Sequence, residues 1–371
     1  MKVVMTLLVR DEADIVEHFL VYHLNRGVDH VLAIDDGSTD GTTEILDSFQ
    51  KEGLVTLVPR PAGVYWEKEA EWHTQLARRA ATEHAADWIL PGDADEFWWP
   101  LWGDIKDVLG SVSPDREAVI APRNDFVFVC PATRNAPQDF TVREKVSALR
   151  PKLALRGSPA VAVSLGAHGA SLGPKLTEVT DTSIGRPVRT SPHAGLRIFH
   201  FGVRSEAQFL GVGERGVRGR GRGMKGGAAH RDALYRRIVK EIPSFELGES
   251  WRQEVLSRGI AEGELVVDDR LAAFYERCPD PRRRGDRDAP LPSCRRPRGP
   301  AEVVDEILEV QALIIDSLQL ENAKMQGRIA RLNRAVEKER AARQRGPLSG
   351  VRRKLPWIGH YLERRFRSRR H

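Results

Sequence analysis

The stretch WILPGDADEFWW, residues 88–99, decides how this chain folds. Its apolar start predicts a short buried strand, and the carboxylates of Asp93 and Asp95 follow where that strand ends. On an extended segment, residues i and i+2 project to the same side, so the two carboxylates can hold one divalent cation. A solvated surface turn is the alternative interpretation. The apolar residues on both sides of the pair favour the metal site, because such residues are usually buried.

Apolar strands alternate with helices in the residues before this stretch. Short apolar runs at 3–9, 30–35 and 54–58 predict buried strands. Apolar residues at helical spacing predict helices at 12–25, around 45–49 and at 68–86. This alternation indicates an α/β fold with a mostly parallel sheet and right-handed crossovers, in which ligands bind beyond the carboxyl ends of the strands.

Polar residues gather at these predicted strand ends. Asp11 follows the first strand, Asp35 and Asp36 end the second, and Asp93 to Glu96 follow the fourth. A carboxylate at such an end can accept hydrogen bonds from a base edge or a ribose. The alternative is that Asp36 and Ser38 only cap the turn into the next helix.

The chain resembles a family 2 glycosyltransferase of the GT-A fold. The matching segments are TLLVRDE at 6–12, DDGSTDGT at 35–42 and DADEF at 93–97, the last typical of a branch with a DADEF-type Asp-x-Asp motif. The resemblance is strong over residues 1–100, thin over 101–210 and absent from 211 onward. It implies transfer of a sugar from a nucleoside-diphosphate sugar, with Mn²⁺ or Mg²⁺ as cofactor.

The resemblance also implies roles for individual residues. Thr6 and Arg10 would line the nucleotide pocket, Asp36 would contact the base, typically uracil, and Asp93 and Asp95 would bind the ribose and the metal–diphosphate group. Asp35 lies beside Asp36 in the same nucleotide-binding set. Asp11 stands where the family usually has Asn, which adds negative charge near a phosphate site.

A late segment, HFGVRS at 200–205, resembles the family's His…Arg-Ser segment. His200 would be a third metal ligand, with His168 as the competing candidate, and Arg204 would neutralise the leaving diphosphate. A buried core histidine is the alternative for His200. The glycine-rich basic segment 211–227 could order over bound phosphates or be a plain insertion.

An inverting transfer needs a general base that deprotonates the acceptor hydroxyl. The carboxylates of Asp125, Asp139 and Glu144 are the candidates, and the sequence does not choose among them. We expect Glu96, next to the metal motif, to bond the loop or the donor sugar.

We expect four segments along the chain. A GT-A domain spans 1–210, with a nucleotide-binding half at 1–100 and an acceptor half at 101–210. Residues 211–300 hold the Gly/Arg-rich loop, a helical segment and a Pro/Arg-rich linker, 301–345 form a coiled-coil helix, and 346–371 form a basic amphipathic tail. The heptad seam places at position a Leu308, Ile315, Asn322, Ile329 and Val336, and at position d Val304, Gln311, Leu318, Met325 and Leu332.

The heptads predict a homodimer through 302–340, and the alternative is one helix packed on the globular body. The tail 351–370 is either a helix on an anionic membrane surface or a disordered segment. Residues 341–371 carry a local charge of +9 within a chain of net charge +6, which leaves the body mildly acidic.

The chain has only three cysteines, which argues against a disulfide framework and fits a reducing cytosol. No apolar stretch reaches about 18 residues, so we expect no membrane span. The predicted location is therefore cytoplasmic, with the possibility of peripheral attachment to the inner face of the membrane through the basic tail.

Three functions are compatible with these patterns. The first is a metal-dependent, inverting glycosyltransferase that uses a UDP-sugar and a hydroxyl acceptor on a glycan or lipid, in cell-surface polysaccharide or glycolipid synthesis. The second is a nucleic-acid-binding protein that uses RGRGRG at 218–223 and the basic tail. The third is a non-catalytic assembly protein built on the coiled coil.

Overall fold

The computed structural model forms two compact units, Met1–Ser317 and Leu318–His371. Within them it describes residues 1–61, 65–127, 137, 139–145, 148–173, 186–191, 195–202, 204, 256–283, 303–312, 315, 319, 326, 327, 330, 331, 333, 334 and 337. The glycine-rich segment 211–227, the tail 351–370 and most of the predicted seam beyond 315 lie outside the described residues. No helix among the described residues is long and apolar enough to cross a membrane.

The first hundred residues alternate strands and helices as expected. In chain order the elements are β1 Val3–Val9, α1 Val16–Leu24, β2 His30–Asp35, α2 Thr42–Lys51, β3 Val55–Leu57, α3 Tyr65–Glu83 and β4 Trp88–Gly92. The strands pair in parallel in the order β3-β2-β1-β4. Every residue of β1 and of β4 is buried, as in strands covered on both faces.

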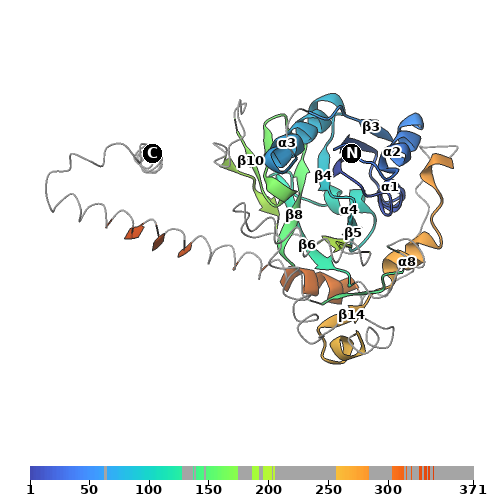
Figure 1. Cartoon of the computed structure of the whole chain (residues 1–371). Helices are drawn as coiled ribbons and strands as arrows, with labels where there is room; N and C mark the ends of the chain where they lie inside the picture. Colours follow the sequence, from blue (N-terminus) through green and yellow to red (C-terminus); the bar gives the residue numbers. More distant parts are fainter. Residues whose placement is uncertain are drawn as a thin grey trace, which may run out of the picture. The chain divides into compact units, whose positions relative to one another are not determined.

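Helices cover both faces of this parallel part of the sheet. The chain moves from β1 outward to β3 through α1 and α2, and then returns through α3 to β4. Right-handed crossovers place α1 and α2 on one face and α3 on the other. Figure 1 shows α3 across the sheet from α1 and α2.

The second half extends the same sheet. Its elements are β5 Glu96–Pro100, α4 Ile105–Gly110, β6 Ala118–Asp125, β7 Val142–Glu144, β8 Ala148–Arg156, β9 Val161–Val163, η1 Leu165–Ala167, β10 Ala170–Leu172, β11 Arg186–Pro187, β12 Thr190–Ser191, β13 Leu196–His200, β14 Leu265–Val267, α8 Arg270–Tyr275 and η2 Pro281–Arg283. The nine-stranded sheet has the order β3-β2-β1-β4-β8-β6-β13-β5, with β12 beside β6. The α/β fold class with a mostly parallel sheet and flanking helices is confirmed.

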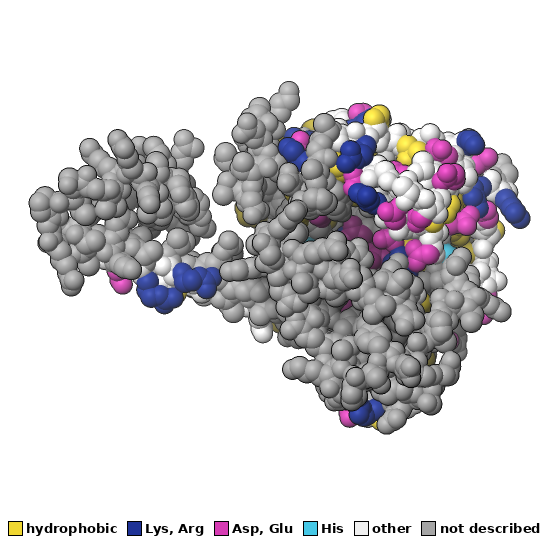
Figure 2. Space-filling view, viewed as in Figure 1, with side chains coloured by type: hydrophobic (Ala, Val, Ile, Leu, Met, Phe, Trp, Pro, Cys, Tyr) yellow, Lys and Arg dark blue, Asp and Glu magenta, His cyan; other side chains and the backbone are white. Residues whose placement is uncertain are grey.

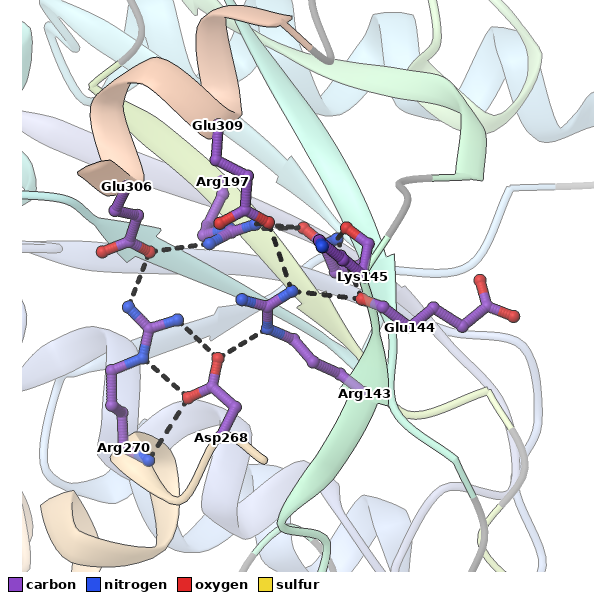
Figure 3. A network of polar contacts seen from close by, with 9 residues as sticks. Arg143, Glu144, Lys145, Arg197, Asp268, Arg270, Glu306 and Glu309 are labelled. Carbon is purple, nitrogen blue, oxygen red and sulfur yellow. Dashed lines mark hydrogen bonds and ion pairs between the residues drawn. The ribbon is translucent and has the colours of Figure 1, made fainter. Parts of the chain in front are cut away.

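A helix at residues 303–312 is fastened to the globular body by buried charges (Figure 3). We call this network the arginine clasp. Its members are Arg143 on β7, Arg197 on β13, Asp268 and Arg270 at the start of α8, and Glu306 and Glu309 on the helix. Apolar packing adds to it, since Val310 is fully buried against the main core.

Cys278 is disulfide-bonded, and its partner lies outside the described residues. The expectation that the cysteines form no disulfide is therefore wrong for this residue. Spacing along the chain did not reveal the bond, because a disulfide depends on how close two side chains come in the folded protein.

Candidate active site

The carboxyl ends of the central strands meet at one edge of the large sheet. β1, β2 and β4 run parallel, and two antiparallel pairings through β8 return β6 to the direction of β4, with β13 parallel to β6. The edge therefore collects Arg10, Asp36, Asp93, Asp125 and His200, each at or just after a strand end. Figure 2 shows a hollow on the surface of the described part of the chain with Asp and Glu side chains gathered in and around it.

Asp35 and Asp11 hold the backbone at this edge. The Asp35 carboxylate accepts hydrogen bonds from Ser38 N at 2.9 Å and from the Thr43 hydroxyl, which fixes the turn into α2. Asp11 accepts a hydrogen bond from Thr39 N at 2.8 Å, so it bonds backbone although it stands where the family usually has Asn. The turn-capping alternative named Asp36 and Ser38, but it is Asp35 that bonds Ser38 here, and the predicted nucleotide contact of Asp35 stays a prediction.

Asp36 lies deeper and is surrounded by guanidinium groups. Its side chain is 4% exposed and pairs with Arg10 at 3.2 Å and with Arg60. Arg60 also lies over the ring of Trp72, 5.5 Å from its centroid. Thr6 is buried on β1, and its hydroxyl has no hydrogen-bond partner in the described part of the chain. Two of the predicted nucleotide-binding residues, Arg10 and Asp36, therefore contact each other, and Arg60 contacts the same carboxylate.

Asp93 to Asp95 form a turn, so the prediction that an extended segment projects both carboxylates to one side is wrong. Glu96 N donates a hydrogen bond to the carbonyl oxygen of Asp93 at 3.0 Å and closes the turn between β4 and β5. Strand alternation does not apply inside a turn, and the two carboxylates have different partners. Asp93 pairs with Lys152 at 2.8 Å, whereas Asp95 lies 3.3 Å from His200.

Lys152 is a buried cation shared by two carboxylates. Its side chain is 1% exposed, and its amine lies 2.5 Å from Glu96 and 2.8 Å from Asp93. Burial disfavours the ammonium ion, but the two carboxylates outweigh burial and raise the pKa of Lys152. For Asp93 burial acts upward, and the attraction of Lys152 lowers the pKa below its ordinary value. Glu96 pairs within the protein with Lys152 and, at 3.6 Å, with Arg123.

His200 joins two carboxylates from different strands. Its Nε2 lies 3.3 Å from Asp95 Oδ2, and its Nδ1 lies 2.6 Å from Asp125 Oδ1. Burial and the nearby Arg123 lower the pKa of His200, but Asp95 and Asp125 outweigh them and raise it to about 9. Of the two histidines considered as metal ligands, His200 is the one that contacts an aspartate of the DAD turn.

The spacing of Asp95 and His200 fits a divalent cation, which on binding would displace the proton from Nε2 of His200. Two ligand atoms about 2.1 Å from one ion and at right angles lie about 3 Å apart, close to the 3.3 Å between Asp95 Oδ2 and His200 Nε2. Asp125 holds the other ring nitrogen, as carboxylates commonly do for metal-bound histidines. In the described part of the chain no group of three His, Cys, Asp or Glu side chains has the geometry of a complete metal site. The remaining ligands would come from diphosphate oxygens and water.

Arg204 is held by acidic side chains near the DAD turn. It hydrogen-bonds Asp14 at 2.7 and 2.9 Å and also Glu12, and it lies 3.9 Å from Asp95. Burial, followed by the charge of Asp95, raises the pKa of Glu12 to about 7 against the opposing pull of Arg204. The predicted contact of Arg204 with a leaving diphosphate stays a prediction.

The three predicted general-base candidates lie in different surroundings. Asp125 is bonded to His200 and lies 3.3 Å from Arg123. Glu144 on β7 is partly buried, and burial followed by the charge of Asp125 raises its pKa to about 7. Asp139 lies in a turn between β6 and β7 and is partly exposed. The geometry therefore brings Glu144 and Asp125 together beside the His200 side of the edge.

Sequence reasoning missed three cations, Lys152, Arg123 and Arg60. A signal was present for Arg123, which follows the apolar run at the start of β6, but not for Lys152, since β8 also holds Arg150 and Arg156. A lone cation in an apolar strand is rarely buried without a carboxylate partner. Arg60 gave no signal, since it lies in a loop whose position depends on the fold.

His168, the competing metal-ligand candidate, lies away from the contacts of Asp95. It follows η1, and its Nδ1 lies 3.1 Å from the carbonyl oxygen of Pro151. Its charge acts on the buried His73 of α3, on the Asp93 side of the DAD turn.

Among solved structures, the chain is similar to TarS from S. aureus, with 16% identity and a TM-score of 0.30 over 42% of this chain and 28% of that one. It is also similar to TarS 1–349 from S. aureus in complex with UDP, with 14% identity and a TM-score of 0.30 over 42% and 47% of the two chains. A third is a mycobacterial protein, with 15% identity and a TM-score of 0.23 over 33% and 41%. The chain spans less than half the length of each of these three chains.

No curated protein matches the chain. Residues 10–163 match the family model described as glycosyl transferase family 2, a range that contains the turn at Asp35 and Asp36, the DAD turn and Lys152. The matched range and the α/β fold agree with the resemblance of the motifs. Residues 10–163 are therefore identified as a glycosyl transferase family 2 segment.

Proposed function

We propose that the protein transfers a sugar from a UDP-sugar to a hydroxyl acceptor with inversion, with the help of Mn²⁺ or Mg²⁺. The observation that carries this proposal is the linked set Asp95, His200 and Asp125, which gathers two metal-ligand side chains and a carboxylate that orients the imidazole. The acidic edge beside it suits a cation, and Arg10 and Arg60 around Asp36 support a nucleotide pocket. The family match over residues 10–163 supports this proposal over the nucleic-acid-binding and non-catalytic alternatives.

Glu144 is the general base in this proposal. Asp125 is already engaged by His200 and Arg123, whereas Glu144 has a pKa of about 7, which suits proton transfer near neutral pH. The acceptor oxygen forms a bond to the anomeric carbon of the sugar, the bond from that carbon to the diphosphate oxygen breaks, and the acceptor proton passes to Glu144. The cation, when bound, would neutralise charge on the departing UDP.

Calorimetry of UDP with and without Mn²⁺ tests the donor and the metal. We expect the native protein to bind UDP more tightly with Mn²⁺, and Asp95→Ala to lose that gain. Asp115→Asn is a matched control, because Asp115 is an exposed aspartate at the end of β6 opposite Asp125. The proposal fails if native protein shows no Mn²⁺-dependent binding of UDP.

We also propose that the helix at 303–312 begins the predicted homodimer of 302–340. The predicted seam residues Val304 and Leu308 of this helix are 52% and 57% exposed, and Ile315 beyond it is 53% exposed. Glu306 and Val310 are buried against the body. A helix packed on the body alone would bury its largest apolar side chains, so the exposed seam supports a second copy as its occupant. Sedimentation of the full chain should give a dimer, and a concentration-independent monomer would refute it.

The acceptor and location stay proposals. A glycan or lipid hydroxyl in cell-surface polysaccharide or glycolipid synthesis agrees with a basic tail at 351–370 that binds the inner face of the membrane. Co-sedimentation of the full chain with vesicles rich in phosphatidylglycerol, compared with pure phosphatidylcholine, tests the tail. Equal binding to both would oppose an electrostatic contact.

A further inference from the structure

The backbone that carries Glu144 is held by hydrogen bonds from the face of the strand opposite its carboxylate. Arg143 Nη1 donates to the carbonyl oxygen of Glu144 at 3.1 Å, and Asn124 Nδ2 donates to the same oxygen at 3.3 Å. Asn124 also donates to the carbonyl oxygen of Lys145 at 3.5 Å. Figure 3 shows the Glu144 side chain pointing away from the guanidinium group of Arg143. These donors therefore hold the strand through its backbone, while the carboxylate is directed to the other face.

The strand β7 has little pairing of its own to fix the position of Glu144. It lies outside the nine-stranded sheet and pairs over three residues with β14, and an isolated bridge joins Arg143 to Phe126. A two-stranded ribbon is only marginally stable by itself. Asp125 and His200, by contrast, end paired strands of the large sheet. The place of Glu144 relative to these two residues therefore depends on side-chain contacts as well as on strand pairing.

Asn124 is the residue that joins β6 to the backbone of β7. It lies directly before Asp125 and is fully buried. Its Oδ1 accepts hydrogen bonds from two nitrogens of Arg197, from Nη2 at 2.7 Å and from Nε at 3.2 Å. The opposite orientation of the amide would set its NH₂ group against the guanidinium group and its oxygen against two carbonyl oxygens. Arg197 therefore fixes the amide with its donor nitrogen toward β7.

The helix at 303–312 holds the two arginines in turn. Glu306 accepts a hydrogen bond from Arg197 at 2.7 Å, and Glu309 accepts from Arg197 at 3.1 Å and from Arg143 at 3.5 Å. Buried ion pairs often add little to the free energy of unfolding compared with apolar residues of similar volume. They do add direction, because a hydrogen bond restricts distance and angle whereas apolar burial is non-directional. The arginine clasp is therefore suited to place a segment of backbone as well as to fasten the helix.

We propose that Asn124 is a positioning residue, oriented by the arginine clasp, that sets the place of Glu144 beside Asp125 and His200. Its amide joins the strand that carries Asp125 to the backbone of Glu144, so it fixes the separation between the base and the metal side of the site. Proton transfer needs the base within hydrogen-bond reach of the acceptor, and a misplacement of about 1 Å can cost about 100-fold in rate. This inference rests on the proposed function, in which Glu144 is the general base. It makes the helix at 303–312 a part of what sets the rate of transfer.

Release of UDP with Mn²⁺ present tests the inference, with water as acceptor and UDP-glucose, UDP-galactose and UDP-N-acetylglucosamine as donors. Asn124→Asp keeps the oxygen that accepts from Arg197 and removes the donor to the two carbonyl oxygens. We expect it to lower kcat for the best of these donors about 10- to 100-fold, while KM and UDP affinity stay within about twofold of native. Asn124→Leu adds no charge and should show the same split between kcat and KM.

Asn25→Asp is the matched control. Asn25 is likewise buried, and its Nδ2 donates to the carbonyl oxygens of Val21 and Pro279 at 2.9 Å each. It lies at the end of α1 that precedes β2, away from the strand ends of the site. The control loses hydrogen bonds of the same kind and should keep kcat within about twofold of native, because distant sites act independently. Equal losses of kcat in Asn25→Asp and Asn124→Asp would overturn the inference.

The same change in a Glu144→Gln background separates positioning from a general structural effect. If Asn124 acts through Glu144, Asn124→Asp should alter the residual rate of Glu144→Gln by no more than about twofold, because residues that act as a unit are not additive. A full further loss in that background would overturn the inference, and so would native kcat in both Asn124 variants.

Glu309→Ala provides the test in a partly exposed residue, should both Asn124 variants fail to fold. The side chain of Glu309 is 31% exposed, and its removal takes a partner from both Arg143 and Arg197. We expect a lower kcat in otherwise native protein and no further loss in Glu144→Gln, and equal losses in the two backgrounds would overturn the inference. Native protein that neither binds UDP nor releases it from any of the three donors would instead overturn the proposed function.

Discussion

Two buried clusters of charged side chains lie on opposite faces of the same strands, and they differ in how completely their charges are paired. In the arginine clasp, Arg197 pairs with Glu306 at 2.7 Å and with Glu309 at 3.1 Å. Asp268 forms ion pairs with both Arg143 and Arg270. At the candidate active site, by contrast, Asp93 and Glu96 share one cation, Lys152, and Glu144 forms no ion pair with the described residues. Complete pairing fixes charges and holds structure, whereas incomplete pairing leaves groups that can take up a proton or a ligand.

The separation of the two clusters follows from strand alternation. Neighbouring residues of a strand point to opposite faces. On β7, Arg143 belongs to the clasp and Glu144 to the site, and on β6, Asn124 accepts a hydrogen bond from the clasp while Asp125 holds His200. The clasp is therefore attached to the same backbone that positions the reactive groups.

The pKa values of a clasp carboxylate, Asp268, and a site carboxylate, Glu144, are shifted in opposite directions. Burial would raise the pKa of Asp268, but hydrogen bonds and charge from Arg270 and Arg143 outweigh it and lower the pKa well below the ordinary value. Burial and the charge of Asp125 instead raise the pKa of Glu144 to about 7. The clasp carboxylate stays ionised at any physiological pH, and the site carboxylate titrates near neutrality.

The largest expected effect is on chemistry at Glu144. Glu144→Gln should lower kcat of sugar transfer by about 10²–10⁴-fold, because a general base contributes about that factor, while UDP affinity stays within twofold. Steady-state kinetics with the preferred UDP-sugar and calorimetry with UDP measure the two quantities. If Asp125→Asn lowered kcat and Glu144→Gln did not, the base assignment would move to Asp125.

The next effect is on stability at the clasp. Arg197→Met leaves Glu306 buried without this partner and should lower the free energy of unfolding by about 3–5 kcal/mol. The double variant Arg197→Met with Glu306→Met should recover much of that loss, because a buried pair replaced by apolar residues is often nearly neutral. Urea unfolding measures both. A double variant as unstable as the single one would mean that the clasp charges themselves hold the helix.

A smaller effect is the pH dependence of stability from Glu144. Its folded pKa of about 7 lies above the unfolded value of 4.5, so the folded state binds the extra proton and stability decreases as pH rises from about 4.5 to 7. The charged groups that act on Glu144 are Asp125, Arg123 and His200. Melting temperatures at pH 5, 6 and 8 should decrease less steeply in Glu144→Gln than in native protein. Parallel curves for the two proteins would contradict the raised pKa.

The smallest effect on folding is expected at the seam. Leu308→Glu changes an exposed side chain, so the stability of the monomer should change by no more than about 0.5 kcal/mol. The same change should convert the dimer to monomer in sedimentation, since it places a charge in the apolar seam. Glu337→Gln, at an exposed position outside the a and d sets, serves as the control.

Local patterns predicted the secondary structure of the first hundred residues well. Each of the strands at 3–9, 30–35, 54–58 and 88–90 is present, and β4 continues two residues further, through Gly92. These segments are predictable because a strand buried on both faces is a continuous apolar run. The residues at their ends, Asp36, Asp93 and Asp95, were found for the same reason.

The partners of those residues were not predictable. Lys152 lies 59 residues after Asp93, and β8 reaches the edge only through its antiparallel pairing with β4. The turn at the DAD motif was also missed, since an extended segment and a tight turn can share one short sequence.

The sequence by itself determined the α/β class, the resemblance of residues 10–163 to glycosyl transferase family 2 and the acidic strand ends, because apolar periodicity and short motifs are local properties of a chain. The tertiary structure alone decided which charges meet. It placed Lys152 against Asp93, His200 between Asp95 and Asp125, and the arginine clasp on the opposite face, because contacts between distant segments depend on strand order and register. The pairing of charges from distant segments therefore decided which carboxylates stabilise the fold and which lie at the candidate active site.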